Sequence, residues 1–232
     1  MNSNRKNAIM AGVFYITATV ASSLTFILLG FLNAPDYLIN VSANENQVLG
    51  DMFIELIWAL AVVGIIVMLF PILKKHNEAL ALGFFSLRFI EAISVIVGSI
   101  ILLSLLTLSQ QYAIAGAPGA SHFQTAGTLF LAARDWAFLL GSGLVFSLSA
   151  LILNYLLYQS KLIPRWLSGW GLVGATLSFA NYLPQFFGID SVVILFLPIA
   201  VQEMVFAVWL IVKGFNSSAI ASEPAKTGSN EG

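Results

Sequence analysis

Six stretches of the sequence each hold about 20 or more mostly apolar residues, the length that an α-helix needs to cross the roughly 30 Å hydrocarbon core of a bilayer. They comprise residues 8–32, 53–73, 80–108, 128–158, 167–187 and 192–212. The third and fourth stretches are longer than a crossing needs, so we expect them to tilt or to protrude. The sequence therefore predicts an all-α integral membrane protein, a six-helix transmembrane bundle.

The composition excludes a water-soluble globule. Hydrophobic residues make up 59% of the chain and charged residues 9%, against about 25% charged residues in an ordinary soluble domain. The mean hydropathy is +0.90, and a soluble chain of 232 residues could not bury so much apolar surface. The lipid bilayer is therefore the expected partner. A net charge of −1 argues against nucleic acid, whose phosphates require basic surfaces.

The distribution of Lys and Arg predicts the orientation of the bundle. Cytoplasmic connections of membrane proteins are enriched in these residues. Here the basic residues outside the stretches lie only at alternate ends of them, and they are Arg5, Lys6, Lys74, Lys75, Lys161, Arg165 and Lys213, with Lys226 in the tail. The connections at 34–50, 110–127 and 188–191 contain neither residue type. We therefore expect a multi-pass protein of the cell membrane with both termini in the cytoplasm.

The two ends of the chain are assigned by length and composition. The first apolar stretch continues well past Ala21, which is too far for the short apolar region of a cleaved signal peptide. It is therefore expected to be a true span. Residues 1–215 are predicted to form one transmembrane domain. Residues 216–232 lack apolar periodicity and are predicted to be a disordered cytoplasmic tail.

Six charged residues lie inside the predicted spans. Each would cost about 2.5–3.5 kcal/mol at the centre of a lipid-exposed helix, so we expect the six side chains to meet each other or water inside the bundle. They are Glu55, Arg88, Glu91, Arg134, Asp135 and Glu203.

Counting residues from the ends of the spans places Glu91 and Glu203 about 15 Å and 17 Å from opposite faces, which is close to the midplane for both. Arg88 and Glu91 are three residues apart and share one helix face. Arg88 can therefore bridge Glu91 and Glu203, and these three residues form the predicted intramembrane charged site. Pro198, five residues before Glu203, is expected to interrupt the last helix.

A second charge pair is predicted in the outer third of the bundle. Glu55 and Arg134 lie at similar depths in the second and fourth spans, and Asp135 is adjacent to Arg134. Asp135, Ser142 and Ser149 recur every seven residues, which indicates a polar seam along one face of the fourth span.

Three functions are compatible with these charges. Two arginines face four carboxylates, and burial disfavours the charged form of a carboxyl, so at least one carboxyl is expected to be protonated unless water reaches it. We therefore favour a small-molecule or proton-coupled carrier, or a binding protein. The alternative is a structural or accessory subunit whose charges only fix helix packing. The third is an intramembrane enzyme, which would need a water-accessible pair of acids.

Other chemistry finds no support in the sequence. The chain has no cysteine, and its two histidines fall in connections on opposite sides of the membrane, so no metal site is predicted. Ser142 lies between two glycines but lacks the sequence context of a nucleophile, and no phosphate-binding loop occurs. We expect no cofactor, and the assignment leans away from an enzyme.

Several strings of residues carry a resemblance to a known family. They are residues 77–83, 88–91, 133–141, 157–171 and 209–215, together with Glu203. The chain resembles a bacterial family of polytopic membrane proteins catalogued as domain of unknown function 4386. Gln159 stands where that family is expected to have a basic residue. The resemblance implies a bacterial cytoplasmic membrane and six spans, and it implies no activity, substrate or catalytic residue.

The predicted orientation can be tested with reporter fusions. Fusions after Lys75 and after Lys161 should report a cytoplasmic location, and a fusion within the connection that begins near Ala113 should report an external one, because basic connections stay in the cytoplasm. A cytoplasmic signal from the Ala113 fusion would overturn the layout.

Overall fold

The computed structural model describes residues 3–116 and 122–221, and this part of the chain is all-helical, as predicted. The longer helices are α1 (Ser3–Leu28), α3 (Glu45–Leu73), α4 (Glu78–Ile114), α5 (His122–Phe138), α6 (Phe146–Ser160), α7 (Arg165–Tyr182) and α8 (Leu197–Val212). The shorter ones are α2 (Tyr37–Ala43) and α9 (Ser217–Ala221). A π-helical stretch, Leu139–Val145, joins α5 to α6. Short 3₁₀ turns cover Gly30–Asn33, Leu183–Phe187 and Val193–Leu195.

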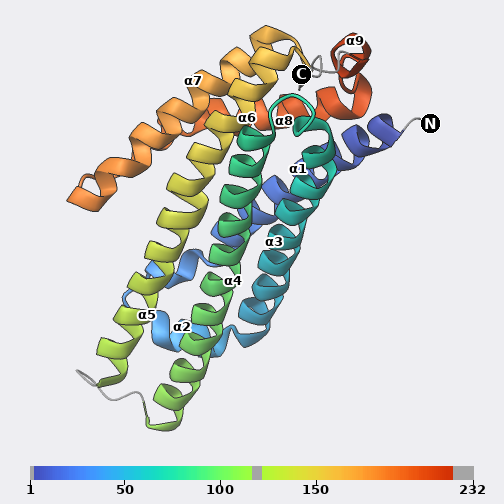
Figure 1. The fold of residues 1–232 in the computed structure, drawn as a ribbon. Coiled ribbons are helices and arrows are strands. Elements are labelled where there is room, and N and C mark those ends of the chain that lie inside the picture. The colour runs from blue at the N-terminus through green and yellow to red at the C-terminus, as the bar shows by residue number, and fades with distance from the viewer. Residues whose placement is uncertain (1–2, 117–121, 222–232) are drawn as a thin grey trace, which may run out of the picture.

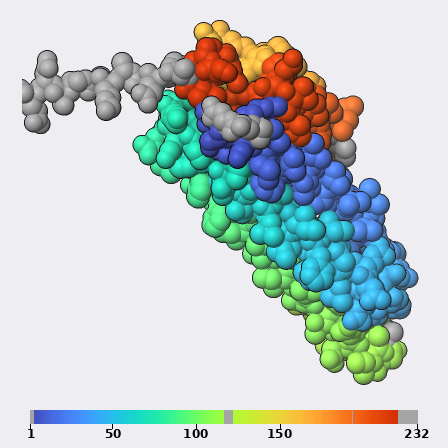
Figure 2. All heavy atoms as spheres, turned by 90° about the vertical axis from the view of Figure 1, so that its right-hand side faces the viewer, coloured from blue at the N-terminus to red at the C-terminus, as the bar shows by residue number. Residues whose placement is uncertain are grey.

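Long rods give the molecule its shape. Helices α3 and α4 and the continuous rod of α5 and α6 run along the molecule, and α1 packs obliquely across α3 (Figure 1). Helices α7 and α8 lie at the end that holds both chain ends, whereas α2 lies at the opposite end (Figure 1). The space-filling view in Figure 2 shows an elongated body that is broad at the end formed by the terminal segments.

The surface of the rods is that of a membrane protein. Four helices, Ser3–Leu28, Glu45–Leu73, Glu78–Ile114 and His122–Ser160, are long and apolar enough to cross a membrane, and Leu197–Val212 is a shorter apolar helix. Large apolar side chains point outward from them: Ile27 is 74% exposed, Val212 61% and Leu60 60%. Such side chains are stable in contact with lipid but not with water.

The narrow end has a small core of its own. Helix α4 has 37 residues and is about 55 Å long, so it exceeds the roughly 30 Å hydrocarbon core. Beside its second half, α2 contributes Leu38 and Val41 to a cluster that also contains Leu105 and Tyr112. The protruding ends of the long helices thus bury apolar surface against the connection that precedes α3.

The start of α4 is fixed by a side-chain cap. Asn77 precedes the helix in extended conformation, and its Oδ1 accepts a hydrogen bond of 3.0 Å from the backbone N–H of Leu80. Glu78 in the first turn adds a favourable charge at the positive end of the helix dipole. Because the cap sets where the helix begins, it also sets the faces on which Arg88 and Glu91 lie.

The ends of three predicted spans required correction. Residues 192–212 were expected to form one helix interrupted at Pro198, but α8 begins at Leu197 and Pro198 lies in its first turn. A proline there removes no intrahelical hydrogen bond, so the predicted interruption is wrong. Helix α1 ends at Leu28 and α7 at Tyr182, before the ends of the predicted stretches at residues 32 and 187, and a 3₁₀ turn follows each helix.

The predicted disorder of the C-terminal tail is also wrong for its first residues. Ser217–Ala221 form α9, and Ala219 is packed against the main core with 8% of its surface exposed. The residues from 222 to 232 lie outside the described part. The connection after α8 is held to the rest of the molecule because the backbone N–H of Asn216 donates to the Leu162 carbonyl at 2.9 Å.

Two glycines allow α8 to approach its neighbours closely. A Cβ on Gly12 of α1 would lie 2.6 Å from the Ala207 carbonyl oxygen, and a Cβ on Gly174 of α7 would lie 2.9 Å from the Ile199 backbone nitrogen. Both obstructing atoms belong to the backbone of α8. Helices α1 and α7 therefore pack closely against α8. This packing positions the side chains on the inner face of α8.

We expect Gly12→Ala to lower the stability of the protein in detergent by about 1–3 kcal/mol, because the added methyl group would force α1 and α8 apart. The measurement is a thermal or denaturant melt. Gly169→Ala is the matched control, since a Cβ at this helical position of α7 meets nothing within 4 Å. Equal destabilisation by the two substitutions would contradict the close packing of α1 on α8.

Candidate functional site

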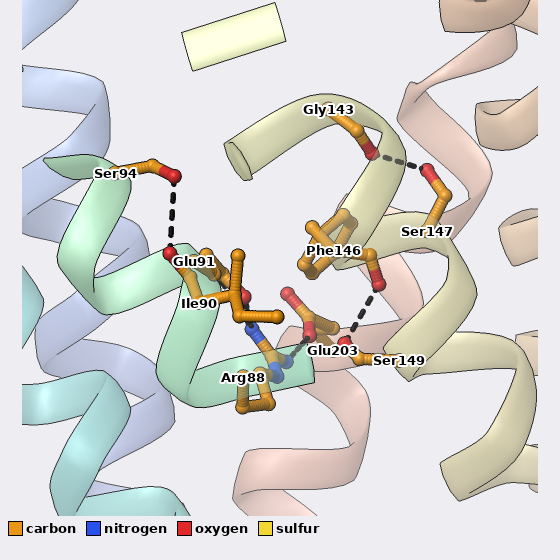
Figure 3. Close-up of polar contacts among 9 residues, drawn as sticks. All are labelled: Arg88, Ile90, Glu91, Ser94, Gly143, Phe146, Ser147, Ser149 and Glu203. Atoms are coloured by element: carbon orange, nitrogen blue, oxygen red, sulfur yellow. Dashed lines mark hydrogen bonds and ion pairs between the residues drawn. The ribbon is translucent and has the colours of Figure 1, made fainter. Parts of the chain in front are cut away.

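A buried cluster of three charged side chains lies in the broad half of the molecule. The Arg88 guanidinium donates through Nη1 to both carboxylate oxygens of Glu91, at 3.2 and 3.0 Å, and through Nη2 to Glu203 Oε1 at 2.8 Å. Figure 3 shows Arg88 between the two carboxylates, with Glu203 reaching in from α8. The charged site predicted from depth counting is therefore assembled in the structure.

Local helix geometry explains half of this cluster. Arg88 and Glu91 lie one turn apart on α4, and residues at this spacing share one face. Glu203 comes from the second turn of α8, more than one hundred residues later in the chain. The packing of α8 against α1 and α7 places the Glu203 carboxylate next to Nη2 of Arg88, while Nη1 is paired with Glu91. The ion pair between Arg88 and Glu203 is thus a tertiary link between α4 and α8.

Aromatic rings surround the guanidinium. The Cζ atom of Arg88 lies 4.9 Å from the centre of the Phe146 ring and 5.6 Å from that of the Tyr15 ring. Such ring faces favour a cation electrostatically. Tyr15 also packs edge-on against Phe206, with ring centres 5.4 Å apart. The Tyr15 hydroxyl and Arg88 Nε are buried and have no hydrogen-bond partner. The cluster therefore keeps two unused polar atoms next to its ion pairs.

The two carboxylates differ in exposure. The side chains of Arg88 and Glu91 are each 3% exposed, whereas that of Glu203 is 15% exposed. With both carboxylates and the guanidinium ionised, the cluster carries one excess negative charge. Glu203 is therefore the least buried member of the cluster.

A second cluster joins α3, α4 and α5. Arg134 forms an ion pair with Glu55, as predicted, and its Nη1 donates to the Gly98 carbonyl at 2.7 Å. The Ser99 hydroxyl donates to Glu55 Oε2 at 2.6 Å. The guanidinium lies 4.7 Å from the ring centre of Phe138. The ion pair itself joins one cation to one carboxylate and carries no excess charge.

Asp135 does not belong to this second cluster, which corrects the prediction. Its side chain is exposed and forms none of the ion pairs found among residues 3–116 and 122–221. It lines a surface pocket of about 400 Å³ that also contains Asp190. Consecutive helical residues point about 100° apart, so the rotation that turns Arg134 inward turns Asp135 outward.

The predicted seven-residue seam along this rod is also interrupted. Ser149 is buried and donates to the Phe146 carbonyl at 2.8 Å, whereas the buried Ser142 hydroxyl has no hydrogen-bond partner. The π-helical stretch Leu139–Val145 lies between Asp135 and Ser149. A π-helical turn takes up extra residues, so a spacing of seven no longer returns to the same face.

Sequence reasoning missed a buried carboxylate. Asp51 is wholly buried in α3, and neither carboxylate oxygen has a hydrogen-bond partner. It lies one turn before Glu55, and Thr25 of α1 is among the polar residues around it. The available signal was the four-residue spacing from Glu55, which places both carboxylates on one helix face. The prediction covered only charges inside the apolar stretches. Asp51 was left out because the second stretch begins at Phe53.

Neither cluster has the composition of a metal centre. In the part of the chain that the structure describes, there is no group of three or more His, Cys, Asp or Glu side chains that could hold a metal ion. The chemistry available to the clusters is therefore that of carboxylates, guanidinium groups and hydroxyls.

Comparison with known proteins identifies a family. A family model described as "Domain of unknown function (DUF4386)" matches residues 10–214. The match spans every helix that contributes to the two clusters. No curated protein and no solved structure matches the chain.

The pair of Glu55 and Arg134 can be tested by a double-mutant cycle. Glu55→Gln and Arg134→Gln should each lower stability in detergent by about 3–5 kcal/mol, because each leaves a buried charge without its partner. The double substitution should cost much less than the sum. Asp135→Asn is the control and should change stability by less than about 0.5 kcal/mol, since its side chain is exposed. Additive losses would show that the two residues are not partners.

Proposed function

The chain belongs to the DUF4386 family, and from that premise we propose that it is a six-span protein of a bacterial cell membrane that binds and exchanges a proton, or a small cationic ligand, at Glu203. It would act as a carrier or binding protein. The observation that carries this proposal is the sharing of one buried guanidinium by two carboxylates.

Six crossings are proposed from the four long apolar helices together with α7 and α8. These two have 18 and 16 residues and are about 27 and 24 Å long, and the 3₁₀ turns between them extend the pair. Both ends of the described chain lie at one end of the molecule (Figure 1), which supports an even number of crossings. The segregation of Lys and Arg supports a cytoplasmic location for that end.

The charge balance of the Arg88 cluster supports exchange of a positive charge. One guanidinium compensates one of the two carboxylates, and an uncompensated charge is costly where the dielectric constant is low. A proton on Glu203, or a cation beside it, would remove the excess. The partial exposure of Glu203 provides access, which neither Arg88 nor Glu91 has.

The position of Glu203 supports a coupling of charge to movement. Helix α8 packs on α1 and α7, and the pair with Arg88 ties it to α4. Neutralising Glu203 would remove one charge of the ion pair between Glu203 and Arg88, and it would leave the ion pair between Arg88 and Glu91 intact. In a carrier, such a step allows one helix to shift relative to the rest of the bundle when the proton or ligand binds.

A second candidate function is that of a structural or accessory subunit, and the hydrogen-bonded network around Glu55 and Arg134 favours it. Arg134, Glu55, Ser99 and the Gly98 carbonyl satisfy one another across three helices. Such a cluster fixes helix register and needs no ligand. If the Arg88 cluster served the same purpose, Glu203 would hold its proton state unchanged across the physiological pH range.

Proton uptake by the protein in lipid separates these two functions. Between about pH 9 and about pH 5, wild type should take up one proton more than Glu203→Gln, because the amide cannot titrate. Asp190→Asn is the matched control, since it removes an exposed carboxyl that takes no part in the ion pairs of the Arg88 cluster. Melting curves establish that each variant is folded. Identical uptake by wild type and Glu203→Gln would refute the exchange of a proton at Glu203 and favour the accessory role.

A further inference from the structure

A basic pocket lies where α6, α7 and α8 meet at the broad end of the molecule. Its volume is about 520 Å³, and its lining includes Lys161, Arg165, Trp209, Lys213 and Asn216. We propose that this pocket binds the phosphate of an anionic phospholipid, with the acyl chains lying along α8. The site is separate from the Arg88 cluster and does not depend on the function proposed for it.

The charges of the pocket call for an anion. Lys161, Arg165 and Lys213 are exposed, and none of them takes part in the ion pairs of residues 3–116 and 122–221. Among the residues that the structure describes, no acidic one lines the pocket. Three cations that converge on one cavity repel each other, and a phosphate placed between them turns that repulsion into attraction.

The backbone around the pocket is held in place. Lys161 closes α6 in left-handed conformation, with a φ of 56°, and Pro164 then leads into α7. The Asn216 backbone N–H donates to the Leu162 carbonyl at 2.9 Å, which ties the end of α8 to this turn. The first backbone N–H groups of α7, at the positive end of its dipole, lie at the same place. The cations are thus presented by an ordered frame.

A fourth cation strengthens the positive field. Arg5 of α1 donates to the Leu210 carbonyl at 2.9 Å and to the Ile211 carbonyl at 2.6 Å. It thereby satisfies the carbonyl groups that the end of α8 leaves without partners. Its guanidinium lies next to Gly214, which lines the pocket. The negative end of the α8 dipole is therefore offset, and it does not repel an anion.

Aromatic residues indicate that the pocket lies at the level of lipid headgroups. Trp166 and Trp209 pack edge to face with ring centres 6.4 Å apart, and the Arg165 guanidinium lies 5.1 Å from the centre of the Tyr158 ring. Tryptophan and tyrosine concentrate at the boundary between membrane and water. Stacking on Tyr158 leaves the N–H edges of Arg165 free to donate to phosphate oxygens.

The outer face of α8 distinguishes a lipid from a free phosphate. Val201, Val208 and Val212 are 49%, 53% and 61% exposed, and they lie on one side of the helix that leads to Lys213 and the pocket. Acyl chains would cover this apolar strip while the phosphate occupies the basic pocket. The pocket thus lies at the end of a strip that contacts acyl chains in the bilayer, and a headgroup attached to such chains reaches it directly, so the occupant we infer is a phospholipid.

Native mass spectrometry of the full-length protein in detergent tests this site. Phosphatidylglycerol, phosphatidylcholine of the same chain length and inorganic phosphate are titrated separately. We expect phosphatidylglycerol to bind wild type at least about tenfold more tightly than phosphatidylcholine. The variant Lys161→Gln, Arg165→Gln, Lys213→Gln should bind phosphatidylglycerol about a hundredfold more weakly, at about fivefold for each charge removed.

The control variant is Lys74→Gln, Lys75→Gln, which removes two cations from the connection between α3 and α4. In the wild type, partial burial and the neighbouring Lys75 lower the pKa of His76. This control should bind phosphatidylglycerol as wild type does. If the triple variant fails to fold, Lys161→Gln and Lys213→Gln replace it, each with an expected loss of about fivefold.

Three results would overturn the proposal. The first is unchanged binding of phosphatidylglycerol to folded pocket variants. The second is equal binding of phosphatidylcholine and phosphatidylglycerol to wild type. The third is inorganic phosphate that binds as tightly as the lipid, which would make the pocket a site for free anions.

Discussion

The cost of a charge inside an apolar bundle determines how the helices of this protein are joined. Arg88 and Arg134 are both buried, and each would be prohibitive facing lipid. Each is instead compensated by a carboxylate from another helix, Glu203 from α8 and Glu55 from α3. Since an unpaired partner would remain charged in a medium of low dielectric constant, these contacts fix the relative rotation of the helices more strictly than apolar packing alone.

The two arginines nevertheless do different things. Arg134 joins Glu55, Ser99 and a backbone carbonyl in one hydrogen-bonded network, which is what a fixed helix register requires. Arg88 is shared by Glu91 and Glu203, and the proposed uptake of a proton or cation rests on the excess negative charge of that cluster. Asp51, one turn from Glu55, is a further buried carboxylate, and neither of its oxygens has a hydrogen-bond partner.

Helix α8 connects the two proposed sites. It carries Glu203 in its first half, and Lys213 follows directly at its end beside the basic pocket. Gly12 and Gly174 allow α1 and α7 to pack closely against its backbone. A phospholipid bound at Lys213 and a proton on Glu203 would therefore act on the same helix. The phospholipid would contact the end of α8, and the proton would change the ion pair between α8 and α4.

The sequence by itself determined the helical class, the membrane environment and the pairing of Arg88 with Glu91, because these follow from composition and from the 3.6-residue period of one helix. Depth counting further predicted the partners Glu203 and Glu55, since charges at one level of a bundle must meet. Only the tertiary structure decided that Asp135 points outward, that α8 begins at Leu197 and that Asp51 is buried without a partner. These features depend on helix rotation, on the π-helical stretch and on how closely neighbouring helices pack, and no local pattern of residues specifies them.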